Sequence, residues 1–287
     1  MTRGIDHLVL AVRDLDRARA FYESLGFTLT PRAVHPWGTA NHLVQLGGCF
    51  LEILGVADAA KIPPHAPGQF SFGAHNRDFL ARREGMSMLV FQSRDARRDQ
   101  AEFAAAGLTT YAPFDFGREA KLPDGGTARV AFSLAYVTDP RIPDGAFFTC
   151  QQHAPKYFWK REYQGHANGA RTIAEVVMAA PDPPAFADFF AKLQGPESVR
   201  AADGALAVAT ARGRIRVLTP QDFAARFGAP PPGPATPRFA AFRIAGCDIG
   251  ATTRLLASAR ITHGLRNGAL HVPASAAHGV MIVFSPE

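Results

Sequence analysis

The sequence predicts an α+β protein built from four β-α-β-β-β units. A strand followed by a short helix recurs at four points along the chain, and in the first three a glycine ends the helix. Two or three further apolar strands follow each helix. Such units imply curved, mixed sheets that are covered by helices on one face. A chain of 287 residues can form two domains of ordinary size, so we expect the units to pair.

The first unit opens with a strand over Ile5–Val12. Asp14 is a suitable N-cap for the helix that follows, and Gly26 ends that helix. Three more strands are predicted over Thr28–Ala33, His42–Leu46 and Phe50–Leu54.

The same order returns three times. The second unit has a strand at Met88–Phe91, a helix from Asp95 to Gly107, and strands at Leu108–Phe114, Arg129–Val137 and Ala146–Gln151. The third has Ile173–Ala179, a helix over Pro184–Leu193 that Gly195 ends, and a hairpin of Ala205–Thr210 with Arg214–Leu218. The fourth has Phe239–Ile244, a helix over Ile249–Ser258, and strands at Gly268–Val272 and Val280–Phe284.

Linker composition divides the chain into two domains. The segment Ala154–Gly169 is rich in aromatic residues and separates units two and three. We therefore predict an N-terminal domain over residues 1–153, an aromatic linker over 154–169 and a C-terminal domain over 170–287.

Composition excludes several classes of protein. The net charge of +6 is mild and the arginines are dispersed, which argues against nucleic-acid binding. No apolar run is long enough to span a bilayer, and the first residues do not resemble a signal peptide. Three widely spaced cysteines in apolar surroundings are typical of core residues in a reducing compartment, so we expect a cytoplasmic protein that contacts neither membrane nor nucleic acid.

Two polar side chains, those of His7 and Glu52, lie on otherwise apolar strand faces of the first unit. His7 is expected to share a strand face with Ile5 and Val9, and Glu52 with Phe50 and Leu54. A carboxylate in such surroundings is costly unless it is paired or binds a cation. His7 is the nearest plausible co-ligand for Glu52.

The opening of the chain resembles a known superfamily. Asp6–Val12, the helix sequence Asp14–Tyr22 and the turn Leu25-Gly26-Phe27 look like the start of vicinal-oxygen-chelate proteins, which include glyoxalase I, bleomycin-resistance proteins and extradiol dioxygenases. The stretches His35–Asn41 and His166–Ala170 resemble a glyoxalase-like branch of that group. The resemblance implies that each pair of units forms a glyoxalase-like open barrel around a cavity.

The resemblance also implies where metal ligands belong, namely on the first and last strands of each unit. His7 and Glu52 match these positions in unit one. In unit two Met88 stands at the first-strand position, and aligning the last strands puts Thr149 opposite Glu52. His153 has the same strand parity as Thr149, so we consider it as a third ligand.

Residues of the same barrel are candidates for contact with a substrate. We select Trp37, Asn41, Phe50, Met88 and Phe148. The alternative for the segment that contains Trp37 and Asn41 is a purely local role in a turn. A turn is also the favoured interpretation of His166 and Asn168.

The C-terminal pair of units lacks a comparable set of ligands. Glu175 matches His7 by position, but the last strand of its unit offers Arg214 and Arg216. We expect Glu175 to pair with one of these arginines, which makes this half a structural partner or a metal-free anion site.

These patterns favour a metal-dependent lyase or isomerase that acts on a small oxygenated substrate. A divalent ion (iron, manganese, zinc or nickel) would be held by His7, Glu52 and His153, with Glu52 also as the catalytic proton acceptor. The alternative is a metal-free protein that binds or sequesters a small molecule in the same cavity. A small-molecule substrate is the expected partner, and a homodimer is the one assembly considered.

Overall fold

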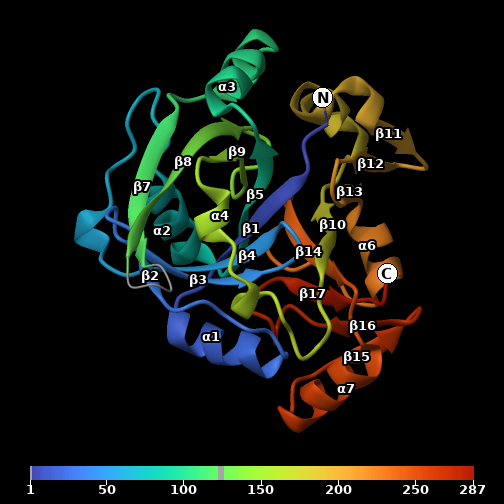
Figure 1. The fold of residues 1–287 in the computed structure, drawn as a ribbon. Coiled ribbons are helices and arrows are strands. Elements are labelled where there is room, and N and C mark those ends of the chain that lie inside the picture. The colour runs from blue at the N-terminus through green and yellow to red at the C-terminus, as the bar shows by residue number, and fades with distance from the viewer. Residues whose placement is uncertain (1, 122–125) are drawn as a thin grey trace.

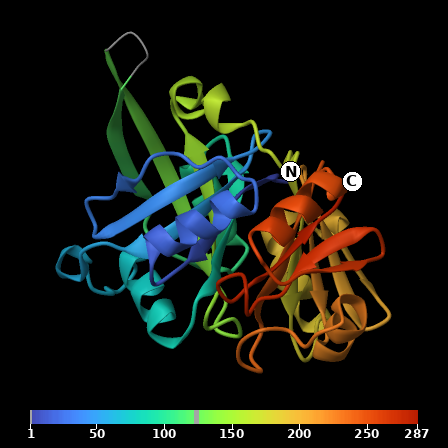
Figure 2. The same ribbon diagram turned by 90° about the horizontal axis from the view of Figure 1, so that it is seen from below.

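The computed structural model describes residues 2–121 and 126–287 and places two mixed β-sheets side by side. The first sheet, with its helices, forms the N-terminal module, and the second forms the C-terminal module. Figures 1 and 2 show the blue-to-green N-terminal module beside the yellow-to-red C-terminal one. Both sheets are open, and neither closes into a complete barrel.

The first sheet has the strand order β2-β3-β4-β1-β5-β9-β8-β6, with β7 paired to β8. Its strands are β1 (Ile5–Ala11), β2 (Ala33–Val34), β3 (Thr39–Gln45), β4 (Phe50–Val56), β5 (Gly85–Ser93), β6 (Thr109–Thr110), β7 (Phe114–Lys121), β8 (Thr127–Thr138) and β9 (Ala146–Gln152).

The second sheet repeats this arrangement in the order β11-β12-β13-β10-β14-β17-β16-β15. Its strands are β10 (Thr172–Ala179), β11 (Val199–Ala202), β12 (Ala205–Ala209), β13 (Arg214–Leu218), β14 (Arg238–Ala245), β15 (Gly264–Arg266), β16 (Ala269–Val272) and β17 (Met281–Phe284).

Strand pairing confirms the four predicted units. In each unit the first strand runs parallel to the last, as in β1 with β4 and β5 with β9. The C-terminal module repeats this in β10 with β13 and β14 with β17. Units then join through antiparallel first strands, β1 with β5 and β10 with β14. The predicted α+β class with two glyoxalase-like open barrels is therefore confirmed.

In the part of the chain that the structure describes, seven α-helices accompany the two sheets. They are α1 (Leu15–Ser24), α2 (Phe72–Arg82), α3 (Ala96–Ala105), α4 (Pro155–Phe158), α5 (Ala187–Gln194), α6 (Pro220–Phe227) and α7 (Ile249–Ser258). Asp14 caps the N-terminus of α1, as the sequence predicted. Its side chain accepts a hydrogen bond from the Arg17 backbone N–H at 2.9 Å. Gly26, with φ of 89°, allows the chain to turn sharply after α1.

The predicted strand over Thr28–Ala33 is wrong except at its last residue. Leu29 in this segment and Phe27 just before it are buried, but the backbone of residues 28–32 forms no regular β-sheet hydrogen bonds. Pro31 has no N–H to donate, so pairing cannot continue through this segment. The predicted strand Leu108–Phe114 is also wrong as one strand, because only the short β6 and the first residue of β7 fall within it. The structure adds α2, α4, α6, β11, β15 and the rest of β7, for which we predicted no element.

The two faces of each sheet pack against different partners. The largest hydrophobic cluster includes Leu8, Leu10 and Tyr22 of the N-terminal module together with Phe190 and Phe242 of the C-terminal one. Smaller clusters fill the opposite faces, around Phe148 in the first sheet and Phe223 in the second. The modules therefore share one core, and each keeps an inner face of its own.

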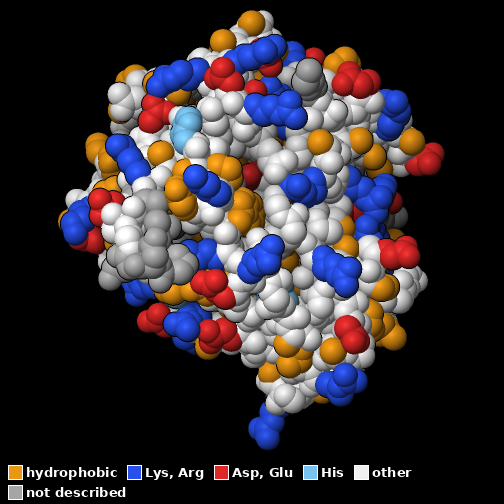
Figure 3. Space-filling view, viewed as in Figure 1, with side chains coloured by type: hydrophobic (Ala, Val, Ile, Leu, Met, Phe, Trp, Pro, Cys, Tyr) orange, Lys and Arg blue, Asp and Glu red, His pale blue; other side chains and the backbone are white. Residues whose placement is uncertain are grey.

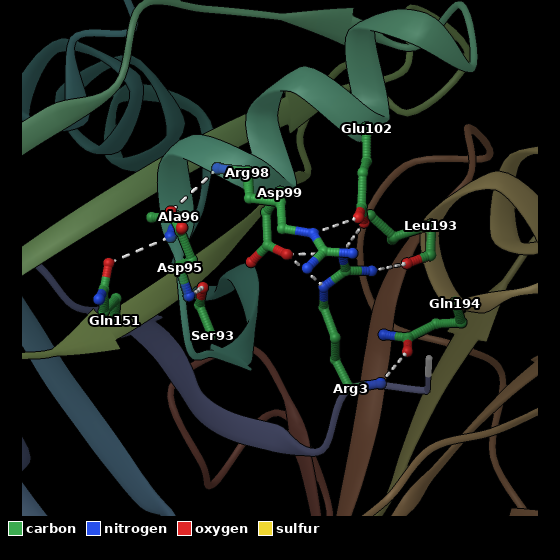
Figure 4. Close-up of polar contacts among 10 residues, drawn as sticks. All are labelled: Arg3, Ser93, Asp95, Ala96, Arg98, Asp99, Glu102, Gln151, Leu193 and Gln194. Carbon is green, nitrogen blue, oxygen red and sulfur yellow. Dashed lines mark hydrogen bonds and ion pairs between the residues drawn. The ribbon is translucent and has the colours of Figure 1, made fainter.

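The N-terminal arm also joins the modules. The Arg3 guanidinium donates to Asp99 and Glu102 of α3 and to the Leu193 carbonyl of α5, and its backbone N–H donates to Gln194 (Figure 4). The closest of these contacts, Arg3 Nη2 to Asp99 Oδ1, is 2.6 Å. One side chain thus ties a helix of each module together.

Within the described part of the chain, no helix has both the length and the apolar character needed to cross a membrane. All three cysteines, Cys49, Cys150 and Cys247, are buried and free.

Candidate functional site

A small pocket lies on the inner face of the first sheet. Its cavity volume is 60 Å³. The pocket is lined by His7, His35, Trp37, Asn41, Leu43, Phe50, Glu52, Phe72, Phe116, Phe132, Leu134, Tyr136, Phe148, Cys150 and Phe158. The wall is mostly aromatic, and the polar groups are concentrated on β1, β3 and β4.

The structure brings His7 and Glu52 together, from the adjacent strands β1 and β4. His7 Nε2 lies 3.7 Å from Glu52 Oε2, which is too long for a hydrogen bond. Two ligand atoms at this separation can both bind one ion at distances of about 2.0–2.2 Å. Both side chains point into the pocket, and both are less than a tenth exposed.

Asp6 fixes the orientation of the His7 ring. Its carboxylate Oδ1 lies 2.6 Å from His7 Nδ1 and accepts the proton of that nitrogen, so Nε2 faces Glu52. A β-bulge between Ile5 and His7 brings these neighbouring side chains together, and it also puts Ile5 on the opposite face from the one we predicted. A carboxylate behind a histidine in this way is typical of metal sites, where it raises the basicity of the ring.

Asn41 holds the second oxygen of Glu52. Asn41 Nδ2 donates to Glu52 Oε1 at 2.6 Å and lies 3.4 Å from His35 Nε2. The Oδ1 atom of Asn41 is buried and has no hydrogen-bond partner among the described residues. This amide oxygen is therefore an available acceptor, or a weak metal ligand, in the pocket.

Aromatic rings enclose the polar groups. Phe50 stacks on the His7 ring with centroids 4.2 Å apart, and Phe148 meets it edge-on at 5.5 Å. Trp37 stacks on His35 at 4.7 Å, which places it in the pocket wall beyond Asn41. Of the residues that we selected for substrate contact, the structure brings Trp37, Asn41, Phe50 and Phe148 to the pocket.

Met88 is not among the pocket-lining residues. It is completely buried in the cluster beneath the pocket, beside Val9. The strand registers show which residues of the two units are equivalent. In unit one Val9, two residues after His7, pairs with Glu52. In unit two Val90, two residues after Met88, pairs with Phe148. Met88 and Phe148 thus stand where unit one has His7 and Glu52, so unit two offers an apolar pair.

The alignment that put Thr149 opposite Glu52 was therefore wrong by one residue. A one-residue shift on a strand exchanges the two faces. Phe148 and Cys150 face the pocket, whereas Thr149 does not line it.

The same shift explains where His153 lies. Its backbone N–H donates to the Ala131 carbonyl, and His153 Nε2 lies 2.8 Å from the hydroxyl of Ser133, which is not a pocket residue. The ring is exposed and outside the pocket, so the structure does not bring His153 to His7 and Glu52. Among the described residues, no three His, Cys, Asp or Glu side chains are grouped to hold a metal.

The aromatic linker closes one side of the pocket. Phe158 of α4 lines the cavity, and its ring lies 5.2 Å from that of Phe50. Gln45 fixes this segment, because its Nε2 donates to the Phe158 carbonyl and its Oε1 accepts from the Lys160 N–H. His166 and Asn168 dock the end of the linker on Gln45 and Leu25, which is a structural role.

Sequence reasoning missed several pocket residues. Phe132, Leu134 and Tyr136 line the pocket from β8, and their alternate spacing could have identified them. The Tyr136 hydroxyl is buried and has no hydrogen-bond partner in the described part of the chain. Burial raises the pKa of Tyr136 well above the usual value, and Cys150 and Glu52 add to this effect. Tyr136 is therefore a neutral donor. His35 also escaped selection, although it lies in the quoted motif.

The C-terminal module carries a different pair of groups at the matching positions. Glu175 follows a bulge in β10 just as His7 follows one in β1, but its partners are arginines. Arg214 Nε donates to Glu175 at 3.0 Å and Arg226 Nη2 at 2.5 Å. This half therefore has no equivalent of the pair of His7 and Glu52.

Comparisons of sequence place the chain within a family. A family model described as "Glyoxalase-like domain" matches residues 5–194, which covers the N-terminal module and the start of the C-terminal one. A search of curated proteins finds no match to this chain.

Solved structures share the whole two-module fold. A hypothetical protein from Staphylococcus aureus aligns with a TM-score of 0.71 at 13% identity, over 99% of both chains. A Mn(II)-bound glyoxalase from Novosphingobium aromaticivorans aligns at 0.57 and 15% identity, over 100% of this chain and 83% of its own. A mutant of 4-hydroxymandelate synthase from Streptomyces coelicolor aligns at 0.57 and 13% identity, over 99% and 92%. At these identities the likeness shows the fold alone.

Proposed function

Because the chain belongs to the glyoxalase-like domain family of the vicinal-oxygen-chelate superfamily, we propose that its N-terminal pocket is the active site of a metal-dependent lyase or isomerase. The substrate would be a small oxygenated molecule that chelates a divalent ion. The observation that carries this proposal is the arrangement of His7 Nε2 and Glu52 Oε2, which face each other at 3.7 Å in an aromatic pocket.

The residues of the pocket fit a weakly held ion. His7 and Glu52 are two strong donors, and the orphaned Asn41 Oδ1 is a third, weaker one. Two strong ligands leave several coordination positions open, which two adjacent oxygens of a substrate can occupy. The presence of a Mn(II)-bound glyoxalase among proteins of this fold supports a divalent ion, with manganese, iron, zinc and nickel all compatible with these ligands.

When bound, the ion would supply Lewis-acid stabilisation of negative charge on a substrate oxygen. Glu52 would take up a proton from the substrate carbon, and Asn41 Nδ2, which donates to Glu52 Oε1, would hold the carboxylate in position. Tyr136 is a neutral donor that can hydrogen-bond a substrate oxygen. Aromatic side chains exclude water from the reacting groups.

Pocket size limits the substrate. A cavity of 60 Å³ is smaller than the roughly 150 Å³ cavity that holds benzene in an engineered protein. The pocket therefore suits a molecule of a few heavy atoms, unless a wall such as Phe158 moves outward.

The test is a manganese titration with and without a chelating probe. Acetohydroxamate presents two adjacent oxygens and is small. We expect it to lower the Kd for Mn²⁺ at least tenfold, because it fills positions that the protein leaves open. Equal Mn²⁺ affinity with and without acetohydroxamate would contradict a site that a vicinal-oxygen ligand completes.

A metal-free binding protein is the second candidate. The observation that favours it is the apolar pair of Met88 and Phe148, which stands where a second set of ligands would be. This candidate predicts no Mn²⁺ binding under either condition, together with binding of a small apolar probe that chelating agents do not affect. For either function we also propose a cytoplasmic location, which three buried, free cysteines support.

A further inference from the structure

A second pocket lies on the inner face of the C-terminal sheet and is unrelated to the proposed active site. Its cavity volume is 170 Å³, and α6, β14 and the β15–β16 hairpin contribute to its wall. The polar residues in its lining are Glu175, Arg226, Arg243, Arg266, Asn267 and His271. Three arginines thus face one carboxylate in a single cavity.

The carboxylate of Glu175 already forms salt bridges with three arginines. It is 1% exposed and accepts from Arg214 at 3.0 Å, from Arg216 at 3.4 Å and from Arg226. Burial alone would raise the pKa of Glu175, but the neighbouring arginines, led by Arg226, outweigh burial and lower it. The carboxylate is therefore ionised, and its own salt bridges satisfy it without Arg243.

Arg243 is the arginine in this lining whose Nε–H has no hydrogen-bond acceptor within the described residues. It lies opposite Glu175 across β10 and β14, yet its Nε atom is buried and makes no hydrogen bond among the described residues. Burial lowers the pKa of Arg243, and the positive charges of Arg214 and Arg226 lower it further, against the opposing effect of Glu175. A buried N–H without an acceptor is costly, and an anion in the cavity would relieve this cost at Arg243 Nε.

The mouth of the pocket adds a further positive charge. Arg266 and Asn267, in and beside β15, are exposed, and Arg266 Nη1 donates only weakly, at 3.3 Å, to the Ala225 carbonyl. Figure 3 shows Arg and Lys side chains gathered on this side of the molecule over β13 and α6. This surplus of positive charge would attract an anion toward the opening.

Apolar side chains make up the rest of the wall. Val177, Ala241 and Val283 belong to the buried cluster of this module and line the cavity. The volume of 170 Å³ is comparable to the roughly 150 Å³ that accommodates benzene. A bare inorganic ion would leave this apolar space unfilled.

We propose that the C-terminal pocket binds a small organic carboxylate, with Arg243 and Arg266 on the carboxylate and the apolar wall around its hydrocarbon body. Arginine suits this role because its planar guanidinium donates two parallel hydrogen bonds to a carboxylate. The site is separate from His7 and Glu52 and does not depend on the function proposed for them.

Binding of benzoate to the full-length protein, measured by calorimetry, tests the proposal. We expect benzoate to bind, uncharged benzamide to bind at least tenfold more weakly, and inorganic phosphate to bind more weakly than benzoate. Arg243→Gln should raise the Kd for benzoate at least tenfold. The control Arg200→Gln, which changes an exposed arginine on β11 outside the pocket, should leave it unchanged.

Three results would overturn the proposal. Equal binding of benzamide would indicate an apolar hollow without anion recognition, and phosphate binding as tight as benzoate would remove the role of the apolar wall. Unchanged benzoate binding in Arg243→Gln would exclude this arginine. If the Arg243→Gln variant does not fold, the Arg266→Gln variant, changed at the exposed mouth of the pocket, tests the same prediction. The Glu52→Gln variant, changed in the N-terminal pocket, should bind benzoate like the wild type.

Discussion

At the scale of single residues, the site depends on how two polar side chains are held. His7 and Glu52 could be predicted because each is a polar residue on an otherwise apolar strand face. Asp6, which lies 2.6 Å from His7, could not be predicted, because the sequence does not reveal the β-bulge beside His7. Asn41 was selected from the sequence, but as a substrate contact and not as the hydrogen-bond donor to Glu52 at 2.6 Å. The pair is therefore more constrained than the sequence indicates.

Replacing Glu52 with Gln preserves the shape of the side chain and removes its charge. We expect the Glu52→Gln variant to bind Mn²⁺ at least tenfold more weakly, because one of two strong ligands is lost. Paramagnetic titration of Mn²⁺ measures this effect directly. Thermal unfolding should change little.

Glu175→Gln is the matched control, since it changes the carboxylate at the corresponding place in the other module. It should leave Mn²⁺ binding unchanged and should lower stability, because three arginines then lose their common partner. Loss of Mn²⁺ in the Glu175 variant and retention in the Glu52 variant would show that the active half is misassigned.

His75 of α2, whose Nε2 atom is buried, predicts how stability depends on pH. Burial lowers its pKa to about 4, against a hydrogen bond to the Ser87 backbone, whereas the unfolded chain titrates near 6.5. The unfolded state thus binds the proton first as the pH falls, so stability is full above pH 6.5 and is lost between 6.5 and 4. Between pH 7 and 5 the loss from this residue is about 2 kcal/mol.

Urea denaturation at pH 7 and pH 5 measures this loss. The His75→Gln variant does not titrate, so its stability should fall less than that of the wild type over the same interval. Parallel losses in both proteins would contradict the assignment to His75.

His153, which we predicted as a third metal ligand, shows why the rest of the site could not be predicted. Strand parity gives the face of a residue only if the register is known. Without a structure the register of β9 was placed one residue off, which put Thr149 at the position of Phe148 and, with it, His153 on the wrong face.

At the scale of elements, the most predictable strands and helices were those whose ends are marked by a capping residue, a glycine or a proline. The predicted bounds of the last helix agree with α7, which Asp248 caps. The helix α6 has similar signals, with Thr219 as its N-cap, Pro220 in its first turn and Gly228 in a left-handed conformation after its end. It was missed because the four-unit pattern has no place for it.

The helix α4, in the aromatic linker between the modules, contributes a side chain to the pocket wall. Gln45 holds it through the Phe158 carbonyl and the Lys160 N–H, and Phe158 lines the pocket. The Gln45→Leu variant should therefore exchange amide hydrogens faster in residues 155–164, with little change in the strands.

Hydrogen-exchange mass spectrometry gives this comparison peptide by peptide. Gln100→Leu is a suitable control, because the Gln100 side chain donates a long hydrogen bond, at 3.5 Å, to Thr110 and belongs to α3, not to the linker. Equal exchange in the linker of both variants would mean that Gln45 does not hold it.

At the scale of the whole molecule, the two modules share a core and should unfold together. The cluster that contains Leu8 and Phe242 extends across both sheets, and Arg3 connects α3 with α5. Arg3 is partly buried, so Arg3→Ala should lower the free energy of unfolding by about 2 kcal/mol.

Urea denaturation should show a single transition for both the wild type and Arg3→Ala. Arg19→Ala removes an exposed pair with Glu23 and should cost less than about 0.5 kcal/mol. Two separate transitions in the wild type, or equal effects of the two substitutions, would contradict a common core fastened by Arg3.

The central claim is that His7 and Glu52 together bind a divalent ion in the N-terminal pocket. A crystal structure of the protein grown with Mn²⁺ and acetohydroxamate, with anomalous data, tests it most directly. We expect one strong anomalous peak at roughly 2.0–2.3 Å from both His7 Nε2 and the Glu52 carboxylate. An anomalous map without a peak between these two side chains would contradict it.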